Sequence, residues 1–125
     1  MKRETVGNRH PSTLISVNTL GSLLQAKGDF AAAESLLREA LEVSRETLGD
    51  RHPNTLMSIN NFGRLLQAKG DFAAAEPLLS EALKGRRETL GNQHPDTLAS
   101  INDLDMLVQA MEILAATEPL LREAN

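Results

Sequence analysis

The sequence predicts an all-α fold, an α-solenoid of three antiparallel helical hairpins in which the third hairpin is degenerate. One observation is a period of 42 residues, which brings three His-Pro pairs into register: His10-Pro11, His52-Pro53 and His94-Pro95. Another is the dodecamer LLQAKGDFAAAE, which occupies 23–34 and recurs unchanged at 65–76. Apolar residues within each unit also follow helical spacing. Units of about 20–50 residues that bury their apolar faces only by stacking are typical of solenoids.

Each predicted helix has residues suited to its two ends. Helices are expected at about 11–27, 30–48, 53–69, 72–90 and 95–110, with a further one at about 113–124. In the second unit Pro53 suits a first helical turn, Gly70 can end that helix with a positive φ, and Asp71 can cap the next helix. Gly91 suits the end of that second helix, and the first unit repeats the pattern. Pro77 and Pro119 are expected to cause mild kinks.

The third unit departs from this pattern. Asp105 replaces the glycine found at 21 and 63, and Glu112 and Ile113 replace the Gly-Asp turn. An unpaired buried carboxylate costs several kcal/mol, so Asp105 is expected to reach water or to splay the hairpin. The last hairpin could be frayed, or its helices could merge into one long helix up to Pro119. We expect an intact hairpin, because ATEPLLREA keeps the 42-residue phase without an insertion.

Composition limits the classes of function. The 125 residues suit one domain, 1–125, with units at about 3–44, 45–86 and 87–125. There is no cysteine, which excludes disulfides and thiolate metal sites. A net charge of −4 without a basic stripe argues against nucleic acid. No apolar segment approaches the roughly 20 residues that span a bilayer, and the N-terminus does not read as a secretory signal. We expect a cytoplasmic protein that binds no membrane and no cofactor.

The second unit, HPNTLMSINNFGRLLQAKGDFAAAEPLLSEAL, and its counterpart in the first resemble a tetratricopeptide repeat of the 42-residue, kinesin-light-chain-like kind. The resemblance rests on the small Gly21 and Gly63, on the Gly-Asp-Phe turns and on alanines at core positions such as Ala75. It implies a right-handed solenoid with a concave surface, lined by the first helix of each hairpin, that holds extended peptides. The family's large aromatic residues are replaced here by smaller apolar ones: Val17, Leu24, Ile59 and Leu66.

Matching the helical phase of the three units places a line of polar residues on this concave surface. The line comprises Asn18, Ser22, Gln25, Asn60, Asn61, Arg64, Gln67, Asn102, Met106 and Gln109. The principal peptide-binding candidates are Asn18, Asn60, Asn61, Arg64, Gln67 and Asn102. Amide side chains can pair with the N–H and C=O groups of any peptide, and Arg64 suits a carboxylate. Alternatively the asparagines match only because the units were duplicated, and they bond a neighbouring helix.

Other polar residues indicate no chemistry. One histidine per repeat is too widely spaced for a zinc site, so a helix-start or packing role is expected. Charged residues of the second helices are expected to form solvated faces: Glu34, Arg38, Glu39 and Glu42, then Lys84, Arg86, Arg87 and Glu88. No nucleophile elbow, phosphate loop or paired zinc histidines is present, so we expect no enzyme and no metal.

The sequence therefore predicts a non-catalytic scaffold that binds a protein or peptide partner in a concave groove. On that interpretation, Asn60→Ala combined with Arg64→Ala should weaken binding without lowering thermal stability. The alternative is a structural spacer or self-assembly unit that makes contacts through its end faces. The uncapped ends are typical of a fragment of a longer array, or of a chain that covers its ends by self-association.

Overall fold

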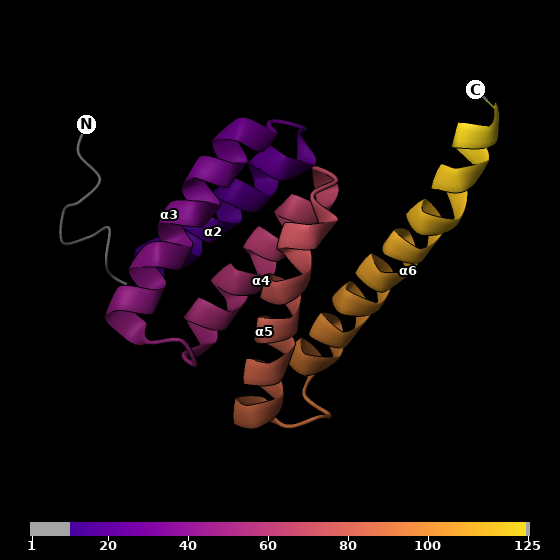
Figure 1. The fold of residues 1–125 in the computed structure, drawn as a ribbon. Helices are drawn as coiled ribbons and strands as arrows, with labels where there is room; N and C mark the ends of the chain where they lie inside the picture. Colours follow the sequence, from indigo (N-terminus) through magenta and orange to yellow (C-terminus); the bar gives the residue numbers. More distant parts are fainter. Residues whose placement is uncertain (1–10, 125) are drawn as a thin grey trace.

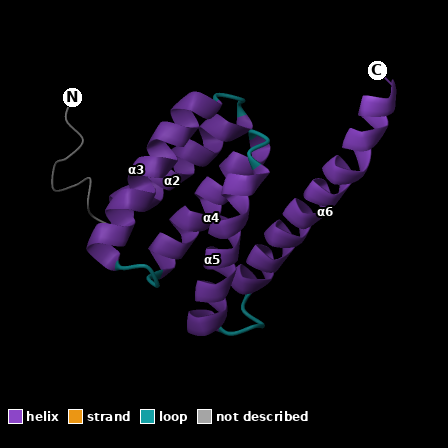
Figure 2. Ribbon diagram, in the orientation of Figure 1, coloured by secondary structure: helices purple, strands orange, loops and turns teal. Residues whose placement is uncertain are grey.

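The computed structural model describes residues 11–124, and this part of the chain contains five helices and no strand (Figure 2). They are α2 (Pro11–Ala26), α3 (Phe30–Leu48), α4 (Pro53–Ala68), α5 (Phe72–Leu90) and α6 (Pro95–Ala124). The first four agree with the predicted helices to within one residue at each end. The expectation of an all-α repeat fold is therefore confirmed.

The turns inside the two hairpins use the residues that the sequence indicates. Gly70 has φ +89°, in the left-handed region that glycine adopts without strain, and Asp71 Oδ1 accepts a hydrogen bond from Ala74 N at 3.3 Å. The first unit repeats this geometry at Gly28 and Asp29. Each hairpin therefore closes over three residues, 27–29 and 69–71, and so short a connection makes its helices antiparallel.

Small residues allow the two helices of a hairpin to pack closely. A Cβ placed on Gly63 would lie 2.8 Å from Leu79 Cδ2, and one on Gly21 would lie 2.6 Å from Leu37 Cδ2. Both leucines are fully buried. The core around them is almost entirely aliphatic, and its largest fully buried apolar side chains are Leu14, Leu37, Leu56, Ile59, Leu65, Leu79 and Leu107.

The helices form two layers. α2, α4 and α6 make the inner layer, since α4 contacts both of the others, whereas α3 and α5 pack outside and between them (Figure 1). Threonines connect α4 and α6 to the outer helix that precedes each of them: Thr55 Oγ1 donates to the carbonyl of Ser44 at 3.2 Å, and Thr97 Oγ1 donates to that of Arg86 at 3.3 Å. These bonds repeat with the 42-residue period.

The prediction of an intact third hairpin is wrong. Residues 95–124 form one continuous helix, which runs through Pro119, and its C-terminal half extends away from the other helices (Figure 1). Without glycine and an aspartate cap at 112 and 113, the backbone keeps its helical hydrogen bonds. Asp105 is exposed and accepts a hydrogen bond from Gln109 at 3.1 Å, so it reaches water as expected.

The expectation of two solvated charged faces is partly wrong. Arg86 is buried, and its guanidinium donates to Ser100 Oγ at 2.8 Å and to the carbonyl of Asp96 at 3.2 Å. Burial lowers the pKa of Arg86, against the attraction of Asp96. Its bonds join α5 to the start of α6, a role that a single repeat does not reveal.

Ion pairs also connect successive outer helices. Arg45 on α3 donates to both carboxylate oxygens of Glu81 on α5, at 2.8 and 2.9 Å, and to Asp50 at 2.9 Å. The hydrogen bonds to Glu81 are the main reason why the pKa of Arg45 is raised above its ordinary value. Bidentate pairs of this kind fix geometry as well as adding energy.

Candidate functional site

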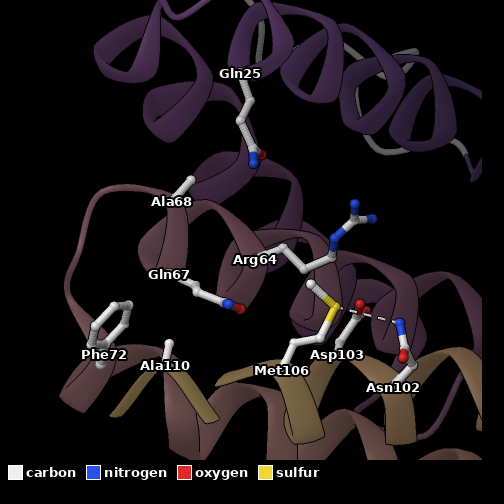
Figure 3. A pocket seen from close by; sticks show the side chains of 9 residues that line it. All are labelled: Gln25, Arg64, Gln67, Ala68, Phe72, Asn102, Asp103, Met106 and Ala110. Carbon is white, nitrogen blue, oxygen red and sulfur yellow. Dashed lines mark hydrogen bonds between the residues drawn. The ribbon is translucent and has the colours of Figure 1, made fainter. Parts of the chain in front are cut away.

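The inner face carries a polar groove, which we name the inner groove. It consists of two adjoining depressions of about 480 and 240 Å³ that share Gln25, Arg64 and Ala68. The larger depression, between α4 and α6, is drawn in Figure 3. Its lining residues are Gln25, Arg64, Gln67, Ala68, Phe72, Asn102, Asp103, Met106 and Ala110. The smaller depression adds Ser22, Ala26, Phe30 and Asn61.

Arg64 lies at the junction of the two depressions. Its side chain is exposed, and within the described part of the chain it has no hydrogen-bond or ion-pair partner. Figure 3 shows it extending from α4, with Gln25 on one side and Met106 on the other. A guanidinium offers five donors in a planar fork, so this side chain can bind a carboxylate in a bidentate manner.

The rest of the groove combines amides with modest apolar surface. Asn61 and Gln67 are half-buried on α4, and Asn102 is exposed on α6, where its Nδ2 donates to Met106 Sδ at 3.6 Å. Asp103, which the sequence interpretation did not include, also lines the groove and accepts a hydrogen bond from Asn60 at 2.9 Å. It occupies the position of Asn61 one period later, and this match in phase could have revealed it.

Two of the six principal candidates, Asn18 and Asn60, lie outside this groove. Asn18 is 1 % exposed, and its Nδ2 donates to Ser58 Oγ at 2.8 Å and to the carbonyl of Leu14 at 3.0 Å. Asn60 is 5 % exposed. These side chains join α2 to α4 and α4 to α6, as in the alternative interpretation of the duplicated asparagines.

The same pattern of bonds recurs with the repeat. Asn18 contacts Ser58 and accepts from Asn61 Nδ2 at 3.4 Å; Asn60 accepts from Ser100 Oγ at 3.4 Å and donates to Asp103. In each case an asparagine bonds the residues 40 and 43 positions later in the chain. We call this set of bonds the asparagine ladder. The two bonded serines, Ser58 and Ser100, are one period apart in the sequence, and this match could have identified the structural role of the ladder.

Of the remaining residues predicted on the concave surface, three line the groove and one does not. Ser22 and Gln25 line the groove, as does Met106. Gln109 lines neither depression and instead bonds Asp105 on its own helix. Four of the six principal candidates are therefore brought together with Gln25 and Asp103 on one surface: Asn61, Arg64, Gln67 and Asn102.

The histidines within the described residues begin helices, as expected. His52 Nδ1 accepts a hydrogen bond from Asn54 N at 3.0 Å, and His94 Nδ1 accepts one from Asp96 N at 3.0 Å. The third, His10, lies outside the described residues. Between residues 11 and 124, no cluster of His, Asp and Glu side chains could hold a metal ion. None of the helices described here is both long enough and apolar enough to cross a bilayer.

Comparison with known proteins establishes the class of protein. The sequence model of the tetratricopeptide repeat family matches residues 12–88, and the chain therefore belongs to that family. No curated protein matches the sequence significantly. Repeats of this family are generally protein-interaction scaffolds and are typically non-catalytic.

Solved structures refine the class. Two crystal structures of nearly identical TPR-like repeats from Podosopora anserina, in a protein assigned as a kinesin light chain, are 30 % and 32 % identical to this chain. One is a single-residue variant. Their TM-scores are 0.69 and 0.67, with 92 % and 91 % of this chain covered and 54 % of each of theirs. This chain is thus a tetratricopeptide-repeat protein of the kinesin-light-chain-like type.

A third structure shares the fold at lower identity. BtubC (BKLC) from P. vanneervenii is 21 % identical, with a TM-score of 0.74 over 82 % of this chain and 41 % of its own. The chain thus spans about half the length, or less, of the solved proteins that it matches.

Proposed function

We propose that this chain is a non-catalytic scaffold that binds an extended, acidic peptide segment of a protein partner in the inner groove. The observation that carries the proposal is Arg64, an exposed cation without a partner among the described residues, at the junction of the two depressions. An unpaired guanidinium can bind a carboxylate, and the amides beside it can form hydrogen bonds with a peptide backbone. A cytoplasmic location stays a prediction from the sequence.

The chemistry of the lining suggests how a peptide would lie. Gln25, Asn61 and Gln67 could pair with its backbone N–H and C=O groups, whatever its sequence, while Arg64 binds one acidic side chain. Phe72 and Met106 offer apolar contact at the α6 side of the groove. Asp103 disfavours a second acidic residue near it, and this repulsion would help to set the position of the peptide.

Asn18 and Asn60 have no place in this proposal, because their amides are buried and bonded between helices. The combined variant Asn60→Ala and Arg64→Ala would therefore confound binding with stability. Arg64→Ala alone is the informative change, because its side chain has no partner to lose among residues 11–124.

The test compares Arg64→Ala with Arg87→Ala, a change at an exposed arginine on the outer helix α5. Each variant is applied to an array of short peptides in which every member is present in a Glu form and in a matched Gln form. Loss of one charge-assisted contact should weaken binding of the Glu forms about tenfold or more. Arg87→Ala should bind like the wild type, and both variants should keep the wild-type melting temperature.

Two results would contradict the proposal. One is equal loss of binding in Arg64→Ala and Arg87→Ala, which would indicate a general charge effect. The other is the absence of any preference for Glu over Gln forms in the wild type. Either would require a different surface or a different ligand chemistry.

A further inference from the structure

The C-terminal half of α6 projects beyond the packed helices and carries exposed apolar side chains (Figure 1). Every residue from 112 to 123 is exposed. The large apolar ones, each more than half exposed, are Ile113, Leu114, Leu120 and Leu121. Leu114 also lines a depression of about 390 Å³ beside the turn between α4 and α5, so its own chain encloses part of its surface. Apolar surface concentrated in this way on one projecting segment indicates a contact surface.

Five side chains form a single stripe along α6. At about 100° per residue, positions separated alternately by four and three residues fall within about 80° of one another around the helix. They are Met106, Ala110, Ile113, Thr117 and Leu120, which we call the α6 stripe. Met106 and Ala110 also line the inner groove. The stripe therefore begins at the groove and continues on the same side of the helix along its exposed half.

The spacing of the α6 stripe fits a partner in helical conformation. Its average repeat of about 3.5 residues is that of a coiled-coil seam, in which the side chains of a second helix pack between those of the first. From Met106 to Leu120 the stripe is about 21 Å long, the length of about four helical turns. An extended peptide matches this surface less well, because its side chains alternate with a period of two.

Acidic side chains lie along one side of the α6 stripe, the side that carries Leu120. Asp105, Glu112 and Glu123 fall within about 20° of one another around the helix, and we call them the acidic edge. Glu112 and Glu123 have no hydrogen-bond or ion-pair partner among residues 11–124. Asp105 accepts a hydrogen bond only from the neutral Gln109. The acidic edge therefore has no cation of its own chain beside it in the described structure.

This charge pattern selects a foreign partner over a second copy. A second copy carries the same acidic edge and the same net charge of −4. The only cation between residues 112 and 124, Arg122, is paired with Glu118 at 3.6 Å on another side of the helix. A copy thus offers no free cation for the edge, and like charges brought together at an interface disfavour association.

We propose that the α6 stripe and the acidic edge together bind a basic amphipathic helix of a partner protein. The apolar seam of that helix covers Ile113, Thr117 and Leu120, and lysine or arginine side chains beside the seam pair with Glu112 and Glu123. Arg64 in the inner groove attracts the opposite charge, so the two surfaces take different segments. The binding of this helix does not depend on the function proposed for the groove.

The first test uses a synthetic helical peptide of about 18 residues, enough to span the stripe. It has leucine at the two seam positions of each heptad and lysine beside them, and in a matched peptide glutamate replaces every lysine. Fluorescence anisotropy with the full chain should show saturable binding of the lysine peptide and binding of the glutamate peptide at least about tenfold weaker. Equal binding of both, or no binding of the lysine peptide at about 100 µM chain, would overturn the proposal.

Matched variants locate the site of the lysine peptide. Leu120→Gln removes apolar contact from the stripe and should weaken binding about tenfold, whereas Leu23→Gln, at a similarly exposed leucine on α2, should have no effect. Glu112→Gln should weaken binding about two- to fivefold, whereas Glu118→Gln changes the net charge equally outside the acidic edge and should leave it unchanged. All four side chains are exposed, so the variants should keep the wild-type melting temperature. Equal effects within either pair would contradict the proposed surface.

Two further measurements separate this surface from the groove and from self-association. Arg64→Ala should bind the lysine peptide like the wild type, so a failure of the groove proposal is distinguishable from a failure of this one. Light scattering of the wild type at about 100 µM should give a mass near 13.6 kDa. A dimer that dissociates in Leu120→Gln and on addition of the lysine peptide would show that a second copy occupies the stripe, and the proposal would then be wrong.

Discussion

Replacement of Asn60 by alanine should destabilise the array much more than the same replacement at its neighbour Asn61. Asn60 is buried, donates to the Asp103 carboxylate at 2.9 Å and accepts from Ser100 at 3.4 Å. Loss of a hydrogen bond to a charged group costs about 1.5–3 kcal/mol, and the weaker bond adds a few tenths, so we expect about 2 kcal/mol. Asn61 is half-buried with one bond at 3.4 Å, and its loss should cost about 0.5 kcal/mol.

Thermal unfolding followed by circular dichroism would measure the difference. For a chain of this size 1 kcal/mol corresponds to about 4 °C, so the melting temperature should fall by about 8 °C in Asn60→Ala and by about 2 °C in Asn61→Ala. A double variant with Asp103→Ala should show strong non-additivity with Asn60→Ala, because the two side chains share a bond. Equal melting temperatures for the two asparagine variants would refute the structural role of the asparagine ladder.

Three further variants test the packing, the turn and an ion pair by thermal melting. Gly63→Ala places a methyl group against the fully buried Leu79 and should cost about 1–3 kcal/mol, whereas a neutral result would mean that α4 and α5 can separate freely. Gly70→Ala puts a side chain at φ +89° and should cost about 1 kcal/mol, whereas unchanged stability would contradict the left-handed turn. Lys69 is the main cause of the lowered pKa of Glu34, so the carboxylate stabilises the fold above its ordinary pKa and loses this effect as the pH falls. The free energy of unfolding of the wild type should therefore exceed that of Glu34→Gln by at most about 1 kcal/mol at pH 7, and this advantage should shrink as the pH falls below the ordinary carboxyl pKa of 4.5; a difference that stays constant would contradict the linkage.

Local signals in the sequence were sufficient for the two complete hairpins. The Gly-Asp turns, the prolines in first turns and the glycines at hairpin contacts each act within a few residues, so their geometry follows from residue type. The 42-residue period then fixed the order of the layers. The expected end of the first inner helices, at about 27 and 69, is one residue longer than in the structure.

The third unit shows where such reasoning fails. The 42-residue phase of ATEPLLREA favoured a hairpin. That phase only shows that the third unit was copied from the others, whereas a turn requires residues that end a helix. Glu112 and Ile113 do not, so α6 continues. The missing turn outweighs the conserved spacing of the apolar face, because an interrupted helix would lose backbone hydrogen bonds without a cap to replace them.

The candidate groove was predictable in part for a related reason. Asn60 and Asn61 lie about 100° apart around α4, at the two edges of the inner face, and the neighbouring helices decide which one is covered. Arg64 was identified because its helical phase places it on the concave surface and its guanidinium suits a carboxylate. Arg86 was misplaced for the opposite reason, since its partners Ser100 and Asp96 belong to the next helix.

The asparagine ladder also determines how the inner helices can move. Contacts among leucine and alanine side chains tolerate sliding of one helix along another, because dispersion forces have little directionality. The bond between Asn18 and Ser58 and the bonds of Asn60 with Ser100 and Asp103 do not, since a shift of one helical turn would break them and leave buried polar atoms without these partners. The buried asparagine bonds beneath the groove therefore determine the spacing between Gln25, Arg64 and Asn102, which line it. A change at Asn18 or Asn60 could thus alter which ligands fit the groove although neither side chain lines it.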